Sequence, residues 1–296
     1  YEQADFEQRP QFTDPELLRS SLAGVILRML DLGLGDPAHF PFLDAPSDRA
    51  IQDGFLLLHE LSAIGGSGEQ RALTPTGRTM ALLPIDVRLA RFLTAARESK
   101  VLEEALIIAS GLSVQDPRER PPEVRGLADA AHLAFVHEKS DFLTLVQLWQ
   151  AYDHEHQELT QSRLRDWCRS HFLSYLRMRE WRELHRQLLV IVREGGWGEI
   201  ASTETALTDA AAYESLHRAL LTAFVTQIAR KDEKFRYRGP RSQQLQIFPG
   251  SGQSKAAPNW ILSGTLMETS KLYALNVARI DPKWICLLYT SPSPRD

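Results

Sequence analysis

Clusters of basic residues are the clearest sign of side-chain chemistry in this sequence. Arg179, Arg182, Arg186 and Arg193 recur at steps of three, four and seven residues, so on a helix they would share one face. Such a face can follow a phosphate backbone, because each Lys or Arg that neutralises a phosphate releases bound counterions. A solvated face whose arginines pair with neighbouring glutamates explains the same spacing equally well. The pattern leaves both interpretations open.

A second group of cations lies in a β-rich segment. Its cations and aromatics alternate along the chain: Lys234, Phe235, Arg236, Tyr237 and Arg238. Alternation along a strand places the two kinds of side chain on opposite faces, so we expect the aromatic rings to pack in a core rather than stack on bases. The loop at residues 248–255 holds backbone N–H groups, serines and a lysine that could bind phosphates. A flexible hairpin loop is the alternative, and the adjacent basic strand favours binding.

The sequence contains no arrangement of residues typical of a catalytic site. Gly65-Gly-Ser-Gly68 lacks the lysine of a phosphate-binding loop, and neither an Asp-Glu-Ala-His run nor a nucleophile elbow occurs. His154 and His156 lie beside acidic residues, but residues two apart do not share a helix face. Asp281, before a proline, is more simply a strand-ending turn than a general acid. We therefore expect no catalytic residue and no metal site.

Composition is that of an ordinary globular protein. The 296 residues are 43% hydrophobic and 24% charged, enough for about two domains or several small ones. No apolar run approaches the roughly 20 residues that span a bilayer, so we expect no membrane contact. Cys168 and Cys286 cannot form a disulfide framework, which favours a reducing cytoplasm. The net charge of −4 argues against a wholly basic nucleic-acid binder, so the distribution of charge matters more than its sum.

Helical periodicity predicts three short helices in the first part of the chain. Their expected boundaries are Asp14 as N-cap with Pro15 at the first helical position, Gly33 as the end of the first helix, Gly65-Gly66 as the end of the second, and Thr76-Gly77 to about Leu83 for the third. A brief extended piece, Arg71–Thr74, lies between the second and third. This order predicts a winged helix over residues 14–83. Nucleic-acid binding and packing against neighbours are equally good interpretations of it.

The remainder is expected to be a helical bundle followed by a small β-barrel. Apolar stripes from residue 86 to 197 occur at helical spacing: Leu89, Phe92, Leu93 and Ala96; Leu102, Leu106, Ile107 and Ser110; Phe142, Leu145, Val146, Trp149 and Tyr152; Phe172, Leu173, Leu176, Trp181, Leu184 and Leu188. A proline-rich connection, Gln115–Gly126, interrupts them. After Arg230, four β-rich segments are predicted at 235–238, 244–248, 260–268 and 271–280. Short strands separated by Gly and Pro clusters favour an OB-fold, so the predicted fold class is mainly α with a terminal barrel.

Several motifs, in this order, resemble the DEAH-box RNA helicases, in particular their bacterial HrpA-like branch. They are Asp14-Pro-Glu-Leu-Leu-Arg19, Val25-Ile-Leu-Arg-Met-Leu30, Leu73-Thr-Pro-Thr-Gly-Arg78, Leu83-Pro-Ile-Asp86, Gly111-Leu-Ser-Val-Gln-Asp-Pro-Arg-Glu-Arg-Pro121, Ser140-Asp-Phe-Leu143, Tyr175-Leu-Arg-Met-Arg-Glu-Trp181 and Ile247-Phe-Pro-Gly-Ser-Gly252. The resemblance covers residues 1–285. It implies that residues 1–13 end the second RecA-like domain, 14–83 form the winged helix, 84–229 the ratchet-like bundle and 230–285 a truncated OB-fold.

The resemblance also implies a function. Such helicases remodel RNA by hydrolysing nucleoside triphosphate between two RecA-like domains, which are missing here, so we expect ATP and Mg²⁺ to belong to those domains and no cofactor in this segment. The expected partners are single-stranded RNA and the RecA-like domains of the same chain. By analogy, RNA contact is assigned to seven residues: Ser251, Gly252, Lys255, Arg118, Arg120, Thr269 and Lys271. The segment alone is expected to be inactive as an enzyme.

Two further expectations concern the chain end and the alternative role. Residues 286–296 follow no preceding pattern and back-translate in one frame onto a transposase adapter used in sequencing libraries, so we expect a non-native tail after Ile285. A natural Pro/Ser tail is the alternative. The alternative function is a protein-docking or regulatory module without nucleic-acid contact. Binding that weakens steeply with salt would distinguish RNA binding from an apolar docking interface.

Overall fold

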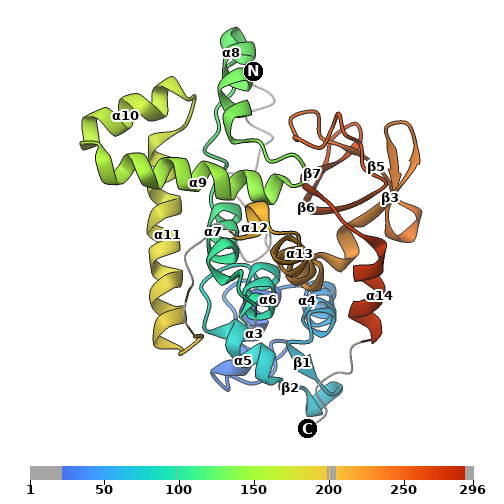
Figure 1. Cartoon of the computed structure of the whole chain (residues 1–296). Helices are drawn as coiled ribbons and strands as arrows, with labels where there is room; N and C mark the ends of the chain where they lie inside the picture. The colour runs from blue at the N-terminus through green and yellow to red at the C-terminus, as the bar shows by residue number, and fades with distance from the viewer. Residues whose placement is uncertain (1–21, 98, 199, 201–204, 291–296) are drawn as a thin grey trace, which may run out of the picture. The chain divides into compact units, whose positions relative to one another are not determined.

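The structure, a computed structural model, describes residues 22–97, 99–198, 200 and 205–290 (Figure 1). The chain divides into two units between Leu82 and Leu83, and each is described by itself. Helices dominate the described residues, and a closed β-barrel lies toward the C-terminus. The predicted fold class, mainly helical with a terminal barrel, is confirmed.

The described residues of the first unit form α-helices and a two-stranded antiparallel sheet. Its elements are α3 (Ala23–Asp31), α4 (Asp48–Glu60), β1 (Ile64–Gly65), β2 (Ala72–Leu73) and α5 (Pro75–Ala81). Ile26, Phe55, Leu58 and Met80 are buried, as their helical spacing requires. The expected Asp14 N-cap and Pro15 lie outside the described residues. The winged-helix assignment stays a prediction.

The helix ends in this unit follow local turn chemistry. Gly33 closes α3 in a left-handed conformation, with φ of 65°, as expected. The prediction that Gly65-Gly66 ends the second helix is wrong, because α4 ends at Glu60 and Ser62 turns the chain with φ of 56°. The N–H of Ser62 donates to the His59 carbonyl at 2.9 Å, which helps to satisfy the last turn. Gly65 lies in β1 instead.

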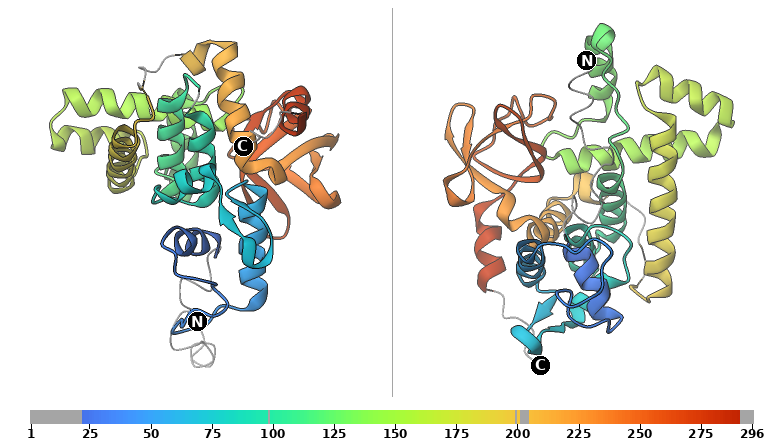
Figure 2. Two further views of the ribbon diagram at one scale, coloured as in Figure 1. Left: turned by 90° about the horizontal axis from the view of Figure 1, so that it is seen from below. Right: turned by 180° about the vertical axis from the view of Figure 1, so that it is seen from behind.

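The second unit begins with a helical bundle. Its helices are α6 (Val87–Ala96), α7 (Leu102–Ser113), α8 (Arg125–His132), α9 (Asp141–Glu158), α10 (Gln161–Ser170), α11 (Tyr175–Glu194), α12 (Thr205–Thr208) and α13 (Ala210–Phe224). Helix α7 contacts α6, α9 and α11, and it is buried along most of its length. Helix α13 packs against α6. Two further views of the ribbon show α6, α7 and α13 between α11 and the barrel (Figure 2).

Three of the four predicted apolar stripes are buried throughout. The fourth is wrong at its start, because Phe172 and Leu173 form a turn between α10 and α11 rather than helix. Phe172 has φ of 53°, and its carbonyl accepts from the Glu119 N–H at 2.8 Å. The prediction that Leu176 is buried is also wrong, because 61% of its surface is exposed. Pairing with the Pro-rich connection thus replaces the helical hydrogen bonds that periodicity predicted.

The barrel consists of five strands in the order β3-β4-β5-β7-β6, closed by pairing of β6 with β3. The strands are β3 (Ile228–Glu233), β4 (Arg236–Arg238), β5 (Gln244–Ile247), β6 (Trp260–Glu268) and β7 (Leu272–Arg279). All pairs are antiparallel except β5 with β7. The four predicted strand segments are confirmed, whereas β3 was missed because it follows α13 after a single short turn.

The interior of the barrel explains part of the alternation around residue 236. Tyr237 is buried with Ala229, Leu245, Ile261 and Val277, whereas Arg236 and Arg238 are exposed. The prediction that Phe235 also packs in a core is wrong. Phe235 lies in the two-residue turn between β3 and β4, and 59% of its surface is exposed. The strand begins one residue later than the alternation predicts, so the period of two does not reach this ring.

A final helix, α14 (Pro282–Thr290), follows the barrel. The helix includes Ile285 and continues beyond it, although the non-native tail was expected to begin after this residue. Residues 291–296 lie outside the described part, and the origin of the tail stays a prediction.

Candidate nucleic-acid interface

The junction between bundle and barrel is organised by one carboxylate. Asp141, the first residue of α9, accepts hydrogen bonds from the Ser251 hydroxyl at 2.5 Å, the Gly252 N–H at 3.0 Å and the Val277 N–H at 2.9 Å. Burial raises the pKa of Asp141 above its usual value, although these hydrogen bonds and the charge of Arg118 act in the opposite direction. The carboxylate therefore ties a helix to two parts of the barrel.

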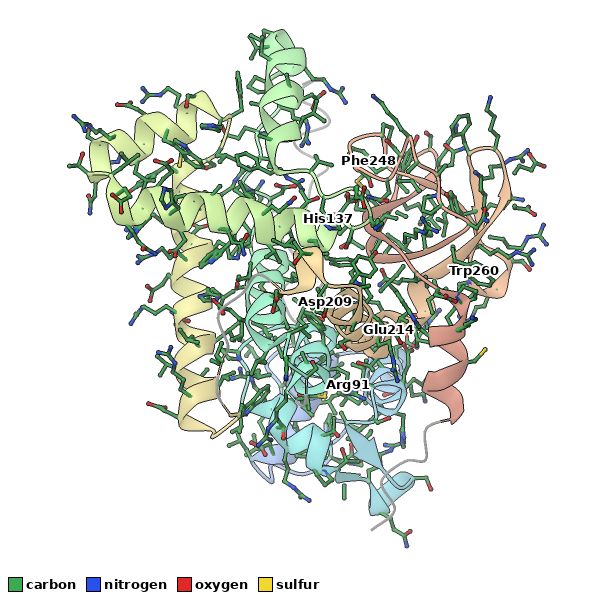
Figure 3. The ribbon with its side chains drawn as sticks, in the orientation of Figure 1. Arg91, His137, Asp209, Glu214, Phe248 and Trp260 are labelled. Atoms are coloured by element: carbon green, nitrogen blue, oxygen red, sulfur yellow. The ribbon has the colours of Figure 1, made fainter. Side chains whose placement is uncertain are left out.

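The loop between β5 and β6 is built around this contact. A Cβ at Gly252 would lie 2.8 Å from Val136 Cγ1, so only glycine allows the loop backbone to lie this close to the connection that precedes α9. Gln253 is buried, and its side-chain amide donates to the Glu138 carbonyl at 3.2 Å. His137 and Phe248, on the two sides of the junction, are labelled in Figure 3. The loop is a packed element rather than the flexible hairpin loop considered as the alternative.

This packing changes what the predicted loop residues can offer a ligand. The donors of Ser251 and Gly252 already bond to Asp141, so they are not free to hold a phosphate in this structure. Lys255, in contrast, is exposed. Of the three loop residues assigned to RNA, Lys255 is the one whose charge faces solvent.

Arg118 and Arg120 lie in the connection between α7 and α8. Arg118 donates through Nε and Nη2 to the two oxygens of Asp116, at 2.9 and 2.8 Å, and its side chain is only 14% exposed. Burial opposes ionisation of Asp116, but the charge and hydrogen bonds of Arg118 outweigh it and lower the pKa of this carboxyl. Arg120 donates to Asp129 at 2.8 Å. Both arginines are held in place by a carboxylate partner.

A small cleft brings several predicted residues together. It has a volume of about 250 Å³, and Arg118, Arg120 and Asp141 line it from the bundle. Phe248 and Ser251 line it from the barrel. Three of the seven predicted contact residues therefore meet at one place, although more than a hundred residues separate the two arginines from the serine. Gly252, Lys255, Thr269 and Lys271 are not part of its lining.

Thr269 and Lys271 occupy the turn between β6 and β7. The Thr269 N–H donates to the Lys271 carbonyl at 2.9 Å, and both side chains are exposed. In an OB-fold, the loop between the fourth and fifth strands and the loop between the first and second are common nucleic-acid contacts. The first corresponds here to the β6–β7 turn, and the second to the β3–β4 turn that presents Phe235. The sequence analysis placed Phe235 in a core and did not include it among the contact residues, although an aromatic beside Lys234 could also have indicated a turn.

The arginines of α11 lie on the exposed side of the bundle, as their spacing predicts. Arg179 and Arg182 line a groove of about 830 Å³ between α9, α10 and α11. Arg186 pairs with Glu183 at 2.7 Å, which is the solvated arrangement considered above. The face therefore contains an arginine held by a glutamate and, in the groove, two arginines that could meet a ligand.

Metal ligands, membrane helices and disulfides can each be looked for among the described residues. No group of His, Cys, Asp and Glu among them could hold a metal ion, and His154 points to solvent. No helix in this part of the chain is long and apolar enough to cross a membrane. Neither Cys168 nor Cys286 forms a disulfide bond within the described part of the chain.

Two protein families match segments of the chain. Residues 86–145 match the family described as helicase associated domain (HA2), ratchet-like, and residues 216–291 match the oligonucleotide/oligosaccharide-binding (OB)-fold family. This pair of domains, with the barrel topology, defines a helicase accessory region.

Relatives over nearly the whole chain identify the kind of helicase. The chain is 44% identical to the ATP-dependent RNA helicase HrpA of Escherichia coli and 43% identical to the HrpA homolog of Haemophilus influenzae, in each case over 96% of its length. It is 29% identical to the pre-mRNA-splicing factor ATP-dependent RNA helicase DEAH10 of Arabidopsis thaliana. The chain spans 22% of the two bacterial relatives and 40% of the plant protein. It is therefore the accessory region, with HA2 and OB-fold parts, of an HrpA-like helicase.

Proposed function

We propose that this region binds single-stranded RNA within an ATP-dependent RNA helicase and forms part of the channel for the strand. The observation that carries the proposal is the cleft at which Arg118 and Arg120 of the bundle meet Ser251 of an OB-fold barrel. A channel wall made of two domains needs such a junction, and OB-folds commonly bind single strands. The names of the relatives support RNA as the nucleic acid.

The same proposal assigns a separate role to each domain. Residues 14–83 are assigned to a winged helix, 84–229 to the bundle and 230–285 to the OB-fold, with residues 1–13 ending a RecA-like domain. ATP and Mg²⁺ would bind to RecA-like domains of the parent protein, which would be cytoplasmic. Hydrolysis would occur there, while this region grips the strand.

The seven proposed contact residues would act in two ways. Lys255, Lys271 and Arg120 would neutralise phosphates, because their cations reach the surface or a cleft. Ser251 and Gly252 would instead shape the cleft, since Asp141 already holds their donors. Arg118 would add positive charge to the cleft wall, and Thr269 would order the turn that presents Lys271. Three phosphate contacts predict a slope of about −2 in a plot of log affinity against log salt.

The test is fluorescence anisotropy of a labelled single-stranded oligoribonucleotide titrated with the full chain across a salt series. We expect saturable binding, weakened several-fold by Lys255→Ala combined with Lys271→Ala, with a reduced salt slope. Lys100→Ala, which removes one exposed cation between α6 and α7, is the control and should change little. Absence of binding at low salt by the folded chain would refute the proposal.

Protein docking is the second candidate function. The groove between α9, α10 and α11 favours it, because the exposed Leu176 and the half-buried Leu184 offer apolar surface there. A docking interface of this kind would bind a protein partner with little dependence on salt. The salt series therefore separates the two functions.

A further inference from the structure

A second basic and aromatic surface lies where β3 pairs with β6, away from the loops that OB-folds commonly use. Trp260 opens β6 and stands opposite Arg230 of β3 in the strand register. The Arg230 guanidinium lies 5.9 Å from the centre of the Trp260 ring, within the range of a cation–π contact. Figure 3 labels Trp260 on the side of the barrel near α14.

Two hollows meet at this tryptophan. The larger has a volume of about 1020 Å³ and is also lined by Lys139, Tyr213, Arg279 and Trp284. The smaller has a volume of about 590 Å³. Arg230, Lys231 and Trp260 line both, so the indole stands between them. The surface is therefore continuous on both sides of one half-buried aromatic ring.

The larger hollow carries an excess of positive charge. Its cations are Lys139, Arg230, Lys231 and Arg279, and its acids are Glu138 and Asp281. Lys139 pairs with Glu138 at 2.8 Å, and Lys231 donates to the uncharged Ala257 carbonyl at 2.9 Å. Within the described part of the chain, no carboxylate forms an ion pair with Arg230 or Arg279. Two cations therefore face the hollow without a charge partner there, which favours an anionic ligand.

The aromatic side of the hollow is held rigidly. The Tyr213 hydroxyl lies 2.8 Å from the Arg279 carbonyl and 3.1 Å from that of Lys139, and it donates to them. Trp284 packs against Tyr213 with ring centres 6.2 Å apart. Tyr213 thus joins α13 to the backbones of Lys139 and Arg279, which are themselves hydrogen-bonded at 2.9 Å. Trp260 and Trp284 are half-buried, so each shows part of its ring to solvent.

We infer that this surface is a second contact for single-stranded nucleic acid, where a base stacks on Trp260 and the neighbouring phosphates lie against Arg230 and Arg279. Base stacking on an indole and unpaired arginines for the backbone are the chemistry by which single strands are held without sequence preference. The inference rests on the proposed function and extends it, because a strand held at the OB loops would continue onto this surface. An acidic segment of a protein partner would use the arginines without needing the exposed ring.

The experiment compares two labelled oligouridylates binding to the full chain by anisotropy. One, of about 5 nucleotides, is within the site size of one OB-fold, and the other, of about 20, exceeds it. For the long strand, we expect Trp260→Ala to raise Kd about tenfold and Trp260→Phe to restore much of the affinity. Arg230→Ala with Arg279→Ala should reduce the magnitude of the salt slope by about 1.4. For the short strand, none of these variants should change Kd, because the OB loops alone would hold it.

The outcomes separate this inference from the proposed function. If the long strand binds with unchanged Kd and salt slope in the Trp260 and arginine variants, while Lys255→Ala with Lys271→Ala weakens it, the second contact is refuted and the proposed function stands. If neither strand binds at low salt, both are refuted. The arginine pair keeps the test decisive should Trp260→Ala unfold, because Arg230 and Arg279 are exposed.

Discussion

The Ser251 hydroxyl donates to the Asp141 carboxylate across a distance of 2.5 Å, although the two residues are 110 positions apart in the chain. Asp141 begins α9 of the bundle, and Ser251 lies in the loop between β5 and β6 of the barrel. The same carboxylate accepts from Val277 of β7, so one side chain links the bundle to two separate segments of the barrel. Charge-assisted hydrogen bonds of this kind are among the stronger polar contacts in proteins.

Replacing this carboxylate should loosen the junction. In Asp141→Asn, one acceptor oxygen becomes an NH₂ group, which then faces either the donors of Ser251 and Val277 or the N–H of Gly252. We expect the free energy of unfolding to fall by about 2 kcal/mol, since hydrogen bonds to a charged group contribute about 1.5–3 kcal/mol. Urea unfolding followed by circular dichroism measures it. Asp166→Asn, which removes an exposed pair with Arg169, is the matched control and should change stability by less than about 1 kcal/mol. Equal effects would contradict the role given to Asp141.

The close approach of the loop to α9 predicts a specific effect of a methyl group. In Gly252→Ala, the new Cβ would lie 2.8 Å from Val136 Cγ1 and 3.3 Å from Asp141 Oδ1. We expect a loss of about 1–3 kcal/mol in thermal or urea unfolding, as for other overpacked sites. Gly126→Ala provides the control, because nothing lies within 4 Å of its Cβ position in α8. Alanine should stabilise that helix by up to about 1 kcal/mol. A neutral Gly252→Ala variant would show that the loop is free to move.

Local pattern predicted four of the five barrel strands and most of the bundle, because their periodicity reflects which side chains are buried. The stripe on α6 and that on α7 are buried as expected. Patterns failed where backbone contacts distant in sequence take over. Phe172 leaves the helix because its carbonyl bonds to Glu119, a partner that no local window contains.

The site was predictable only in part for the same reason. Positive charge at Lys255 and Lys271 could be read from residue type, and both are exposed. The engagement of Ser251 by Asp141 could not, since it requires the docked barrel. Phe235 was assigned to the wrong environment by a single residue, because β4 begins at Arg236 and the ring falls in the turn.

The neutral state of a buried histidine predicts a dependence of stability on pH. His217 accepts from Ser140 Oγ and donates through Nδ1 to the Tyr213 carbonyl, at 2.8 and 2.7 Å. Burial lowers its pKa to about 4, against 6.5 ordinarily. Between these values the unfolded chain binds more protons, so the free energy of unfolding should fall as the pH drops from 6.5 toward 4. The contribution from this histidine amounts to about 3 kcal/mol over that window.

Urea unfolding at a series of pH values checks this dependence. His185 has a pKa lowered to about 4 as well, so the wild-type slope contains both contributions. His217→Gln should remove a part of the slope, while the exposed His154→Gln should retain all of it. An unchanged slope in His217→Gln would mean that this imidazole takes no part.

The exposed ring of Phe235 allows RNA binding at the β3–β4 turn to be tested without removing a charge. Because 59% of its surface is exposed, Phe235→Ala should leave the unfolding transition almost unchanged. If a base stacks on this ring in the β3–β4 turn, the Kd for single-stranded RNA should rise about fivefold or more. The slope of log affinity against log salt should stay the same, since no cation is removed. Leu133→Ala, at a residue that is 68% exposed on the bundle, is the control and should bind like the wild type. Wild-type affinity in Phe235→Ala would show that no base stacks on this ring.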